Sequence, residues 1–211
     1  MSVLFADLVG FTALSEHRDA EEVRELLTRY FETCRQIVTR YGGTIEKFIG
    51  DAVMAVWGAP TAQEDDAERA VRAALDLTGA VTALGADADV PDLRLRAGVV
   101  TGEAAVTIGV DGQGLVAGDI VNTASRVQSV ATPGTVLVND ATRSSTQAAI
   151  THQDAGSFEL KGKSEPLHLW RAERVVAARR GFLRSTGLEA PFVGREARDA
   201  SPQRVVPLLS K

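Results

Sequence analysis

Two aspartates stand where β-strands are expected to end, and carboxylates in such places can take part in chemistry. Asp7 lies in the motif FADLVGFT, directly after an apolar run. Asp51 lies in KFIGDAVMAVWG, after a glycine and between two short apolar runs. Gly-Asp is typical of tight turns, because glycine tolerates positive φ and aspartate can bond to nearby backbone. The sequence therefore predicts a hairpin of strands 44–49 and 52–57 with Asp51 at its tip.

A ferredoxin-like sheet would bring the two carboxylates together, because its first strand lies beside the hairpin. Asp7 and Asp51 would then meet at one end of the sheet. Neighbouring carboxylates repel each other, and a divalent cation relieves that repulsion. Oxygen ligands favour Mg²⁺ or Mn²⁺ over zinc, and such sites commonly bridge a metal to the phosphates of a substrate. The alternative is two unrelated, solvated aspartates, one at a strand end and one in a turn.

A second cluster lies in the motif GDIVNTASR, within a helix predicted at about 119–130. Asn122 and Arg126 are four residues apart, so their side chains share one helix face. An amide suits a ribose oxygen, and a guanidinium suits a phosphate or another spreading negative charge. Taken without the aspartates, a solvated helix face is the simpler interpretation.

Hydrophobic spacing predicts the first set of elements that must hold these residues. Strands are expected at 3–9 and 93–101, and 104–109 extends the latter or forms another. Apolar residues at helical spacing predict a helix from Asp19 to Tyr41, with Asp19 and Glu22 as a capping box. A second helix is expected to begin at a box formed by Thr61 and Glu64.

The remaining elements are shorter and complete the fold prediction. A glycine-rich turn is expected at 109–114, a strand at 136–138 and a brief helix capped by Asn139, followed by strands near 157–161 and 167–173. The order βαββαβ, with extra C-terminal α and β elements, predicts an α+β fold. Its centre is a ferredoxin-like core in which an antiparallel sheet is backed by helices.

Composition and charge narrow the function classes. The chain has 211 residues, of which 45% are hydrophobic and 24% charged, as in an ordinary globular protein. A net charge of −5 argues against a nucleic-acid partner, and no apolar run is long enough to span a membrane. The single cysteine, Cys34, excludes a disulfide framework and fits the reducing cytoplasm, where we expect this protein.

Four motifs, in this order, resemble the class III adenylate/guanylate cyclase catalytic domain: FADLVGFT, EKFIGDAVMAVWG, GDIVNTASR and LKGKSEPLHLW. The resemblance covers about residues 1–173. It implies an adenylate cyclase, a phosphorus–oxygen lyase that converts ATP to 3′,5′-cyclic AMP and pyrophosphate for signal transduction. It also implies a homodimer with composite sites at its interface. Asp7 and Asp51 of one chain would bind two Mg²⁺ or Mn²⁺ ions, and catalysis would fall to the other chain's Asn122 and Arg126.

The substrate contacts implied by this resemblance include one departure from the family. Lys47 would reach the purine edge, and the outer phosphates would be held by the backbone amides of a Phe11-Thr12 turn and by Lys161. Adenylate-specific members carry a polar residue seven positions before the asparagine, where this chain has Leu115. Leucine can pack on a purine but cannot hydrogen-bond its edge, so discrimination between ATP and GTP should be weak or differently arranged. ATP is still the expected substrate, and GTP stays open.

Other functions stay open beside an active adenylate cyclase. A guanylate or relaxed-specificity cyclase is one, and a catalytically weak nucleotide-binding regulatory module is another. The regulatory module is suggested by Leu115 and by a chain that begins directly on a strand, as a fragment of a larger regulator would. A diguanylate cyclase shares the core topology, but FIGDA stands here in place of its Gly-Gly-Asp/Glu-Glu-Phe signature.

Two regions are predicted along the chain. Residues 1–175 form the catalytic domain, and residues 176–211, which carry several arginines and prolines, form a disordered linker or truncated tail. Within the tail, APFVGRE resembles the start of an ATPase domain that follows the cyclase domain in some multidomain regulators. A missing C-terminal ATPase or regulatory domain is therefore one expectation, and an ordinary linker is the other.

Overall fold

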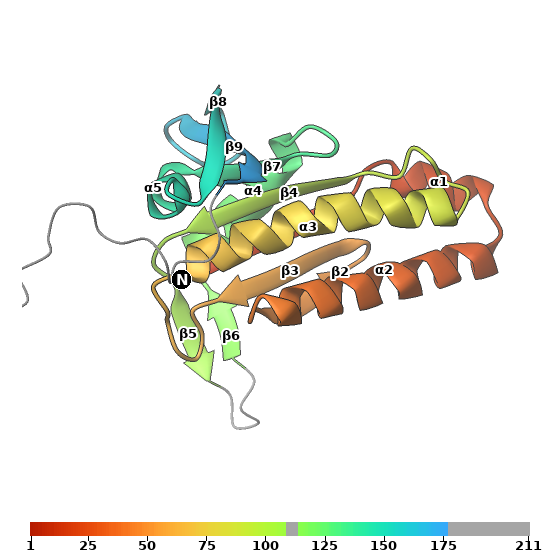
Figure 1. Cartoon of the computed structure of the whole chain (residues 1–211), viewed down its shortest axis with the longest axis horizontal. Coiled ribbons are helices and arrows are strands. Elements are labelled where there is room, and N and C mark those ends of the chain that lie inside the picture. The colour runs from red at the N-terminus through yellow and green to blue at the C-terminus, as the bar shows by residue number, and fades with distance from the viewer. Residues whose placement is uncertain (109–113, 177–211) are drawn as a thin grey trace, which may run out of the picture. The chain divides into compact units, whose positions relative to one another are not determined.

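The computed structural model describes residues 1–108 and 114–176, and within these it leaves out the side chains of 106–108, 114 and 115. The main sheet of this described part has seven strands in the order β2-β3-β1-β4-β7-β9-β8 (Figure 1). A separate two-stranded sheet pairs β5 with β6. Nearly all of the predicted tail and most of the predicted 109–114 turn lie outside the described residues.

The elements of this part have the following bounds. The strands of the main sheet are β1 (Ser2–Leu8), β2 (Thr44–Ile49), β3 (Ala52–Trp57), β4 (Leu95–Thr101), β7 (Val136–Asn139), β8 (Ile150–Phe158) and β9 (Leu167–Val175). The small sheet is formed by β5 (Ala105–Ile108) and β6 (Gly114–Ala117). The helices are α1 (Phe11–His17), α2 (Ala20–Arg40), α3 (Asp66–Asp87), α4 (Asp119–Val130) and α5 (Asp140–Thr146).

The predicted ferredoxin-like core is confirmed. Strand β1 pairs antiparallel with both β3 and β4, and β2 pairs antiparallel with β3. The helices α2 and α3 connect β1 to β2 and β3 to β4, which gives the order βαββαβ. These core pairings are all antiparallel, as predicted, whereas the additional strand β7 pairs with β4 in parallel. The crossover through β5, β6 and α4 returns the chain to the same end of the sheet, as a parallel pair requires.

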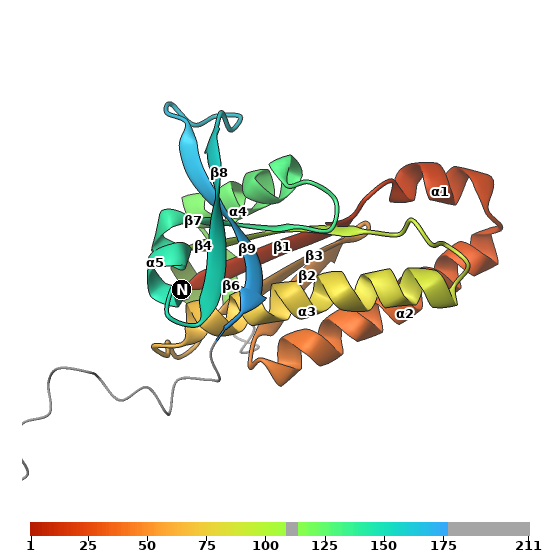
Figure 2. The ribbon, with the colours of Figure 1, turned by 45° about the horizontal axis from the view of Figure 1, so that its top comes forward.

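Helices cover both faces of the sheet (Figures 1 and 2). The helices α2 and α3 pack on one face, where Leu4, Ala6 and Leu8 of β1 join their core. On the other face, Val3 and Phe5 of β1 join a second core with α4. Because successive side chains of a strand alternate between faces, a strand covered on both sides is apolar throughout.

The starts of the two long helices are set by acidic residues. Asp19 caps α2 as predicted, and its carboxylate accepts a hydrogen bond from the backbone N–H of Glu21 at 2.8 Å. The predicted Thr61–Glu64 start of the next helix was wrong, because α3 begins at Asp66. The buried side chain of Arg69 forms ion pairs with the carboxylates of Asp65 and Asp66. These ion pairs hold the N-terminal end of α3 together.

Three other elements also differ from the predictions. Strand β8 occupies Ile150–Phe158 instead of 157–161, and β6 was not predicted. Helix α1 was not predicted either, since none of its side chains is buried and its seven residues are too few to show a repeated apolar spacing. It begins at Phe11, directly after Gly10 in the left-handed conformation with φ 72°.

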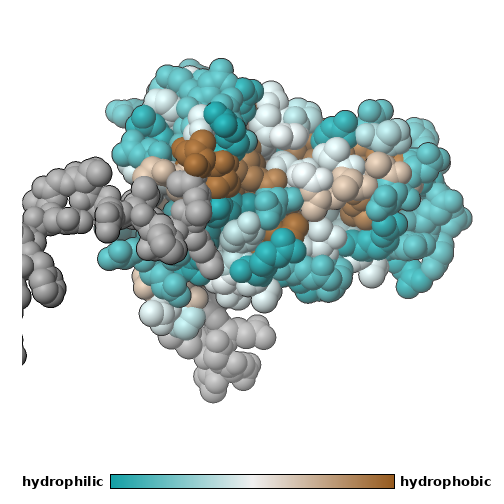
Figure 3. Space-filling model, viewed as in Figure 1, coloured by the Kyte–Doolittle hydropathy of each residue, from teal (hydrophilic) through white to brown (hydrophobic). Residues whose placement is uncertain are grey.

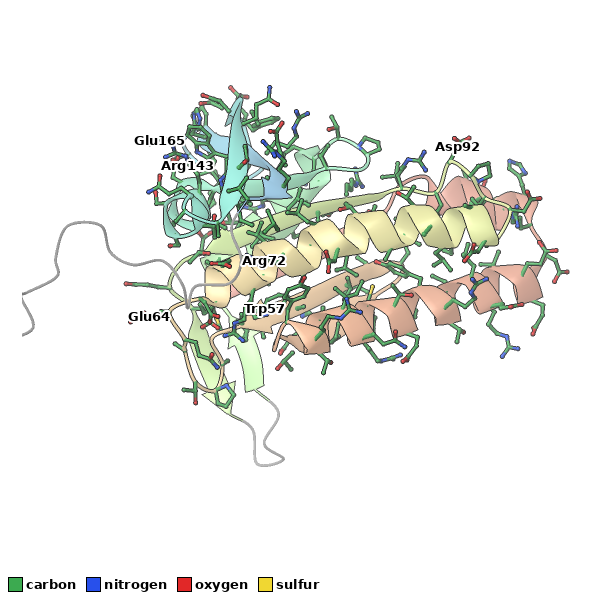
Figure 4. The ribbon with its side chains drawn as sticks, viewed as in Figure 1. Trp57, Glu64, Arg72, Asp92, Arg143 and Glu165 are labelled. Atoms are coloured by element: carbon green, nitrogen blue, oxygen red, sulfur yellow. The ribbon has the colours of Figure 1, made fainter. Side chains whose placement is uncertain are left out.

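The core is anchored away from the hairpin tip by Trp57 at the end of β3 (Figure 4). This side chain is buried, and its indole N–H donates to the backbone carbonyl of Tyr41 at 3.0 Å. On the face seen in Figure 3, hydrophilic residues surround smaller hydrophobic patches. In the described residues, no helix combines the length and the apolar character that crossing a membrane requires.

Candidate active site

Strand β1 and the β2–β3 hairpin bring Asp7 and Asp51 together. The hairpin loop has two residues, Gly50 and Asp51, between the paired residues Ile49 and Ala52. Gly50 has φ 62°, a conformation that glycine adopts without strain at the first position of a tight hairpin turn. Because Ala6 of β1 pairs with Val53 of β3, the end of β1 lies beside this tip. The two carboxylates are therefore neighbours at one end of the sheet.

The closeness of the two carboxyl groups shifts the pKa of Asp51. Burial and the neighbouring Asp7 carboxyl group raise the pKa of Asp51 from 3.8 to about 6. Backbone groups of Asp51 and Leu8 oppose this rise by hydrogen bonding to the carboxylate. The site thus favours a bound positive charge, either a proton on Asp51 or a cation held between the two side chains.

Two further side chains contact Asp7, and the sequence interpretation missed both of them. Arg96 is the cross-strand partner of Asp7 on β4, and its Nη2 donates to Asp7 Oδ2 at 3.0 Å. The buried Gln128 of α4 donates to the same oxygen from Nε2 at 3.4 Å. The Nε–H of Arg96 is buried and has no hydrogen-bond acceptor in the described part of the chain. Arg96 therefore carries an unused donor beside the carboxylate pair.

The donor set fits a magnesium or manganese site that is completed by a substrate. Both contacts from Arg96 and Gln128 are made to one oxygen of Asp7, so they leave its other oxygen available. Among the described residues, no group of three or more acidic, histidine or cysteine side chains could enclose an ion. Mg²⁺ in phosphate-handling enzymes is usually held by one or two carboxylates together with substrate phosphates. Asp7 and Asp51 would supply those two carboxylates.

The residues predicted for catalysis lie in a different place, around the first half of α4. Asn122 is exposed, and the guanidinium of Arg126 lies against Gly162, where an added Cβ would approach Arg126 Nη2 to 3.3 Å. In the same loop, Lys163 forms an ion pair with Asp119 and holds the pKa of that carboxyl below its usual value. Lys161 is exposed nearby in the sequence. This basic cluster joins α4 to the loop between β8 and β9.

The two groups of residues lie on different sides of α4. Side chains on a helix rotate by about 100° per residue, so Arg126 points about 200° away from Gln128. Gln128 faces Asp7, and Arg126 therefore faces away from it. Within the described residues, no hydrogen bond or ion pair links Asn122 or Arg126 to Asp7 or Asp51. One chain thus brings the carboxylates together but not the carboxylates and Arg126.

The residues predicted to contact the substrate occupy three elements. Lys47 is exposed on β2, opposite Met54 and on the α4 side of the sheet. Leu115 lies in β6, where it pairs with Thr107, and its side chain is outside the described part. The expectation of a Phe11-Thr12 turn was wrong, since both residues belong to the first turn of helix α1.

Comparison with known proteins identifies the family. The model of the adenylate and guanylate cyclase catalytic domain matches residues 1–171. Adenylate cyclase 1 of Rhizobium meliloti (strain 1021) is 34% identical over 186 residues, which cover 84% of this chain and 28% of that protein. The chain therefore spans little more than a quarter of the length of this relative.

Solved structures agree with this match. The adenylyl cyclase CyaB from P. aeruginosa superimposes with a TM-score of 0.76 at 34% identity, covering 85% of this chain and 94% of that chain. The guanylyl cyclase Cya2 gives a TM-score of 0.77 at 30% identity with the same coverage. Together with the family match, these likenesses show that the chain belongs to the class III adenylate/guanylate cyclase catalytic domain family.

Proposed function

We propose that this chain is a nucleotidyl cyclase that converts ATP to 3′,5′-cyclic AMP and pyrophosphate. The observation that carries the proposal is the pair Asp7 and Asp51 at one end of the sheet, with the pKa of Asp51 raised to about 6. A raised carboxyl pKa beside a second carboxylate marks a place built to receive positive charge. Family membership supplies the reaction class, and similar structures include both an adenylyl and a guanylyl cyclase.

The reaction requires in-line attack of the ribose 3′-oxygen on the α-phosphorus. The bond from this phosphorus to the bridging oxygen breaks, pyrophosphate leaves, and the hydroxyl proton passes to solvent. Two Mg²⁺ or Mn²⁺ ions on Asp7 and Asp51, when bound, would acidify the hydroxyl and neutralise phosphate charge. Arg96 would keep the Asp7 carboxylate oriented through its hydrogen bond from Nη2. No residue of the described site is a strong general base for the hydroxyl.

The remaining roles follow the chemistry of each side chain. Asn122 would orient the ribose, and Arg126 would stabilise the charge that develops on the α-phosphate, a contribution of about 3 kcal/mol. Outer phosphates would be held by backbone amides of Phe11 and Thr12 and by Lys161. Because the donors of Arg126 face away from Asp7 within one chain, the site is completed by a second copy. A symmetric homodimer would hold two such sites.

Selection of the nucleobase would depend on Lys47 and Leu115. Lys47 can donate a hydrogen bond to a purine edge, whereas leucine at position 115 offers no polar atom. We therefore expect ATP to be used with modest discrimination against GTP, or with both accepted. Incubation with each nucleotide in Mn²⁺ and in Mg²⁺, followed by chromatography of the products, tests this directly.

The outcomes of that incubation separate the candidate functions. Cyclic AMP alone supports an adenylate cyclase, and cyclic GMP or both products support relaxed selectivity at Lys47 and Leu115. No cyclic product from a folded, nucleotide-binding protein would overturn the proposal in favour of a regulatory module. Asp51→Ala is expected to abolish product formation, and an unchanged rate would contradict the two-carboxylate site.

Complementation tests the division of the site between chains. An Asp51→Ala chain lacks the carboxylate, and an Arg126→Ala chain lacks the guanidinium, so each homodimer is expected to be inactive. In a mixed dimer, the Arg126→Ala chain supplies Asp7 and Asp51, and the Asp51→Ala chain supplies Asn122 and Arg126. One site is then intact, and activity should return. Demonstrated heterodimers without activity would refute the composite site.

A further inference from the structure

The small β5–β6 hairpin lies outside the main sheet, yet one side chain ties it to that sheet. Strand β6 lies against β2, which is an edge strand of the main sheet (Figure 1). The backbone N–H of Val116 on β6 donates to Glu46 Oε1 on β2 at 3.3 Å. Val116 is buried, with 4% of its surface exposed, and Glu46 is half-buried. A carboxylate therefore takes the position that a backbone carbonyl would hold if β2 and β6 were paired.

An irregularity in β2 puts Glu46 in position to make this contact. Ile45 pairs with Ala55 and Lys47 pairs with Met54, so Glu46 is the one extra residue of a β-bulge. A bulge leaves its extra residue out of the strand ladder and redirects the side chain. Glu46 is in this way released to contact β6, while Lys47 keeps its regular pairing and its place on the α4 side of the sheet.

This contact links the two positions assigned to base selection. Lys47 follows Glu46 directly in β2, and Leu115 precedes Val116 directly in β6. The hydrogen bond thus joins the backbone of position 115 to the strand that carries the lysine. A two-stranded hairpin on its own is at most marginally stable, so this hydrogen bond and the burial of Val116 both hold β6 against the rest of the domain. Loss of the carboxylate would allow β6 to move relative to Lys47.

We infer that Glu46 is a positioning residue that sets nucleobase selectivity by holding β6 beside Lys47. The inference rests on the proposed function, since it concerns the base pocket of that same site. Glu46 does not touch the substrate in this account. Glu46 acts through the distance between the backbone of position 115 and Lys47. That distance sets the width of the space that a purine would enter.

The test compares Glu46→Ala with Glu46→Gln in the full chain. The amide of glutamine keeps an acceptor oxygen at Oε1, whereas alanine removes it. We expect Glu46→Ala to change the ratio of kcat/KM for ATP to that for GTP at least fivefold. Glu46→Gln should stay within twofold of the natural protein. Glu25→Ala removes an exposed carboxylate on α2 and serves as the matched control, with no expected change.

Amide exchange at Val116, followed by NMR, gives a readout that does not need turnover. The Val116 N–H should exchange at least fivefold faster in Glu46→Ala and at the natural rate in Glu46→Gln. An unchanged exchange rate in Glu46→Ala, or an unchanged selectivity ratio despite faster exchange, would overturn the inference. Equal loss of selectivity in both variants would overturn it as well, because the acceptor oxygen would then be irrelevant.

Failure of the proposed function can be told apart from failure of this inference. If the natural protein forms no cyclic product, the cyclase proposal fails. Selectivity is then read from the ratio of Kd for ATP and GTP, measured by displacement of a fluorescent nucleotide. A fivefold shift of that ratio in Glu46→Ala, rescued in Glu46→Gln, supports the positioning role without catalysis, and no shift refutes it.

Discussion

Removing the charge of Asp51 should make the metal-free protein more stable while making it inactive. Burial and the Asp7 carboxyl group raise the pKa of Asp51 from 3.8 to about 6, so its ionised form is unfavourable in the folded state. Asp51→Asn keeps the size and most hydrogen-bonding capacity of the side chain but cannot ionise. The variant therefore relieves a repulsion that the natural protein retains at neutral pH.

The expected size of this effect follows from the pKa shift. One pKa unit corresponds to about 1.4 kcal/mol, so a rise of about 2 units sets an upper limit of about 3 kcal/mol. Asp51 is only half-buried, and solvent screening reduces this figure to about 1–2 kcal/mol. For a domain of this size we expect the melting temperature in EDTA to rise by about 3–5 °C.

The pH dependence follows from the direction of the shift. Because the folded pKa lies above the unfolded value, the folded state binds more protons between about pH 4 and pH 6. This contribution to stability is complete below about pH 4 and is lost as the pH rises through about 6. The melting temperatures of Asp51→Asn and the natural protein should therefore converge at pH 4 and separate at pH 7.

The assay pairs thermal unfolding with cyclase activity. Mn²⁺ should raise the melting temperature of the natural protein but much less that of Asp51→Asn, and cyclic nucleotide formation should fall by about 100-fold or more. Asp92→Asn, a change at an exposed carboxylate between α3 and β4, is the control and should alter neither property (Figure 4). A lower melting temperature for Asp51→Asn in EDTA at pH 7 would refute the repulsion on which the site is built.

Three further substitutions test the packing and hydrogen bonds of the domain. Gly98→Ala would place a Cβ 2.5 Å from the backbone N of Gln128, so α4 must shift, and urea unfolding should show a loss of about 2 kcal/mol or more. Gln128→Ala removes a donor to Asp7, and Mn²⁺ affinity measured by calorimetry should fall about tenfold, whereas an unchanged affinity would exclude a positioning role. Asn139→Ala removes an acceptor that serves two backbone N–H groups at 3.1 Å and a donor to the Thr101 carbonyl, and urea unfolding should show a loss of about 2 kcal/mol.

The sequence predicted those parts of the fold that are coded locally. The apolar spacing of residues 119–130 matched α4, and Asp19 and Asn139 cap the helices that they were predicted to cap. The start of α3 was misplaced, because the decisive contacts of Asp65 and Asp66 are made to Arg69 and not to a capping glutamate. The parallel pairing of β4 with β7 was missed, since strand direction depends on the whole crossover.

In the candidate site, too, some residues could be predicted from the sequence and others could not. Asp7 and Asp51 could be paired from the sequence, because the ferredoxin-like order fixes the neighbours of β1. Arg96 could not be found, since its contact with Asp7 depends on the exact register of β1 against β4. Gln128 could not be found either, since its contact with Asp7 depends on how α4 packs against β1, 121 residues away in the sequence.

The opposite directions of Gln128 and Arg126 on α4 are the strongest physical reason to expect an active site shared between two chains. The helix presents Gln128 to Asp7 and Arg126 to Gly162, and no rotation of the helix can turn both side chains toward one ligand. Such a rotation is also blocked by close packing, since Gly98 already lies against the backbone of Gln128. If Arg126 and the two carboxylates act on the same nucleotide, the arginine must therefore come from another chain. The spacing of a few residues on one helix thus makes association of two copies a condition of the proposed chemistry.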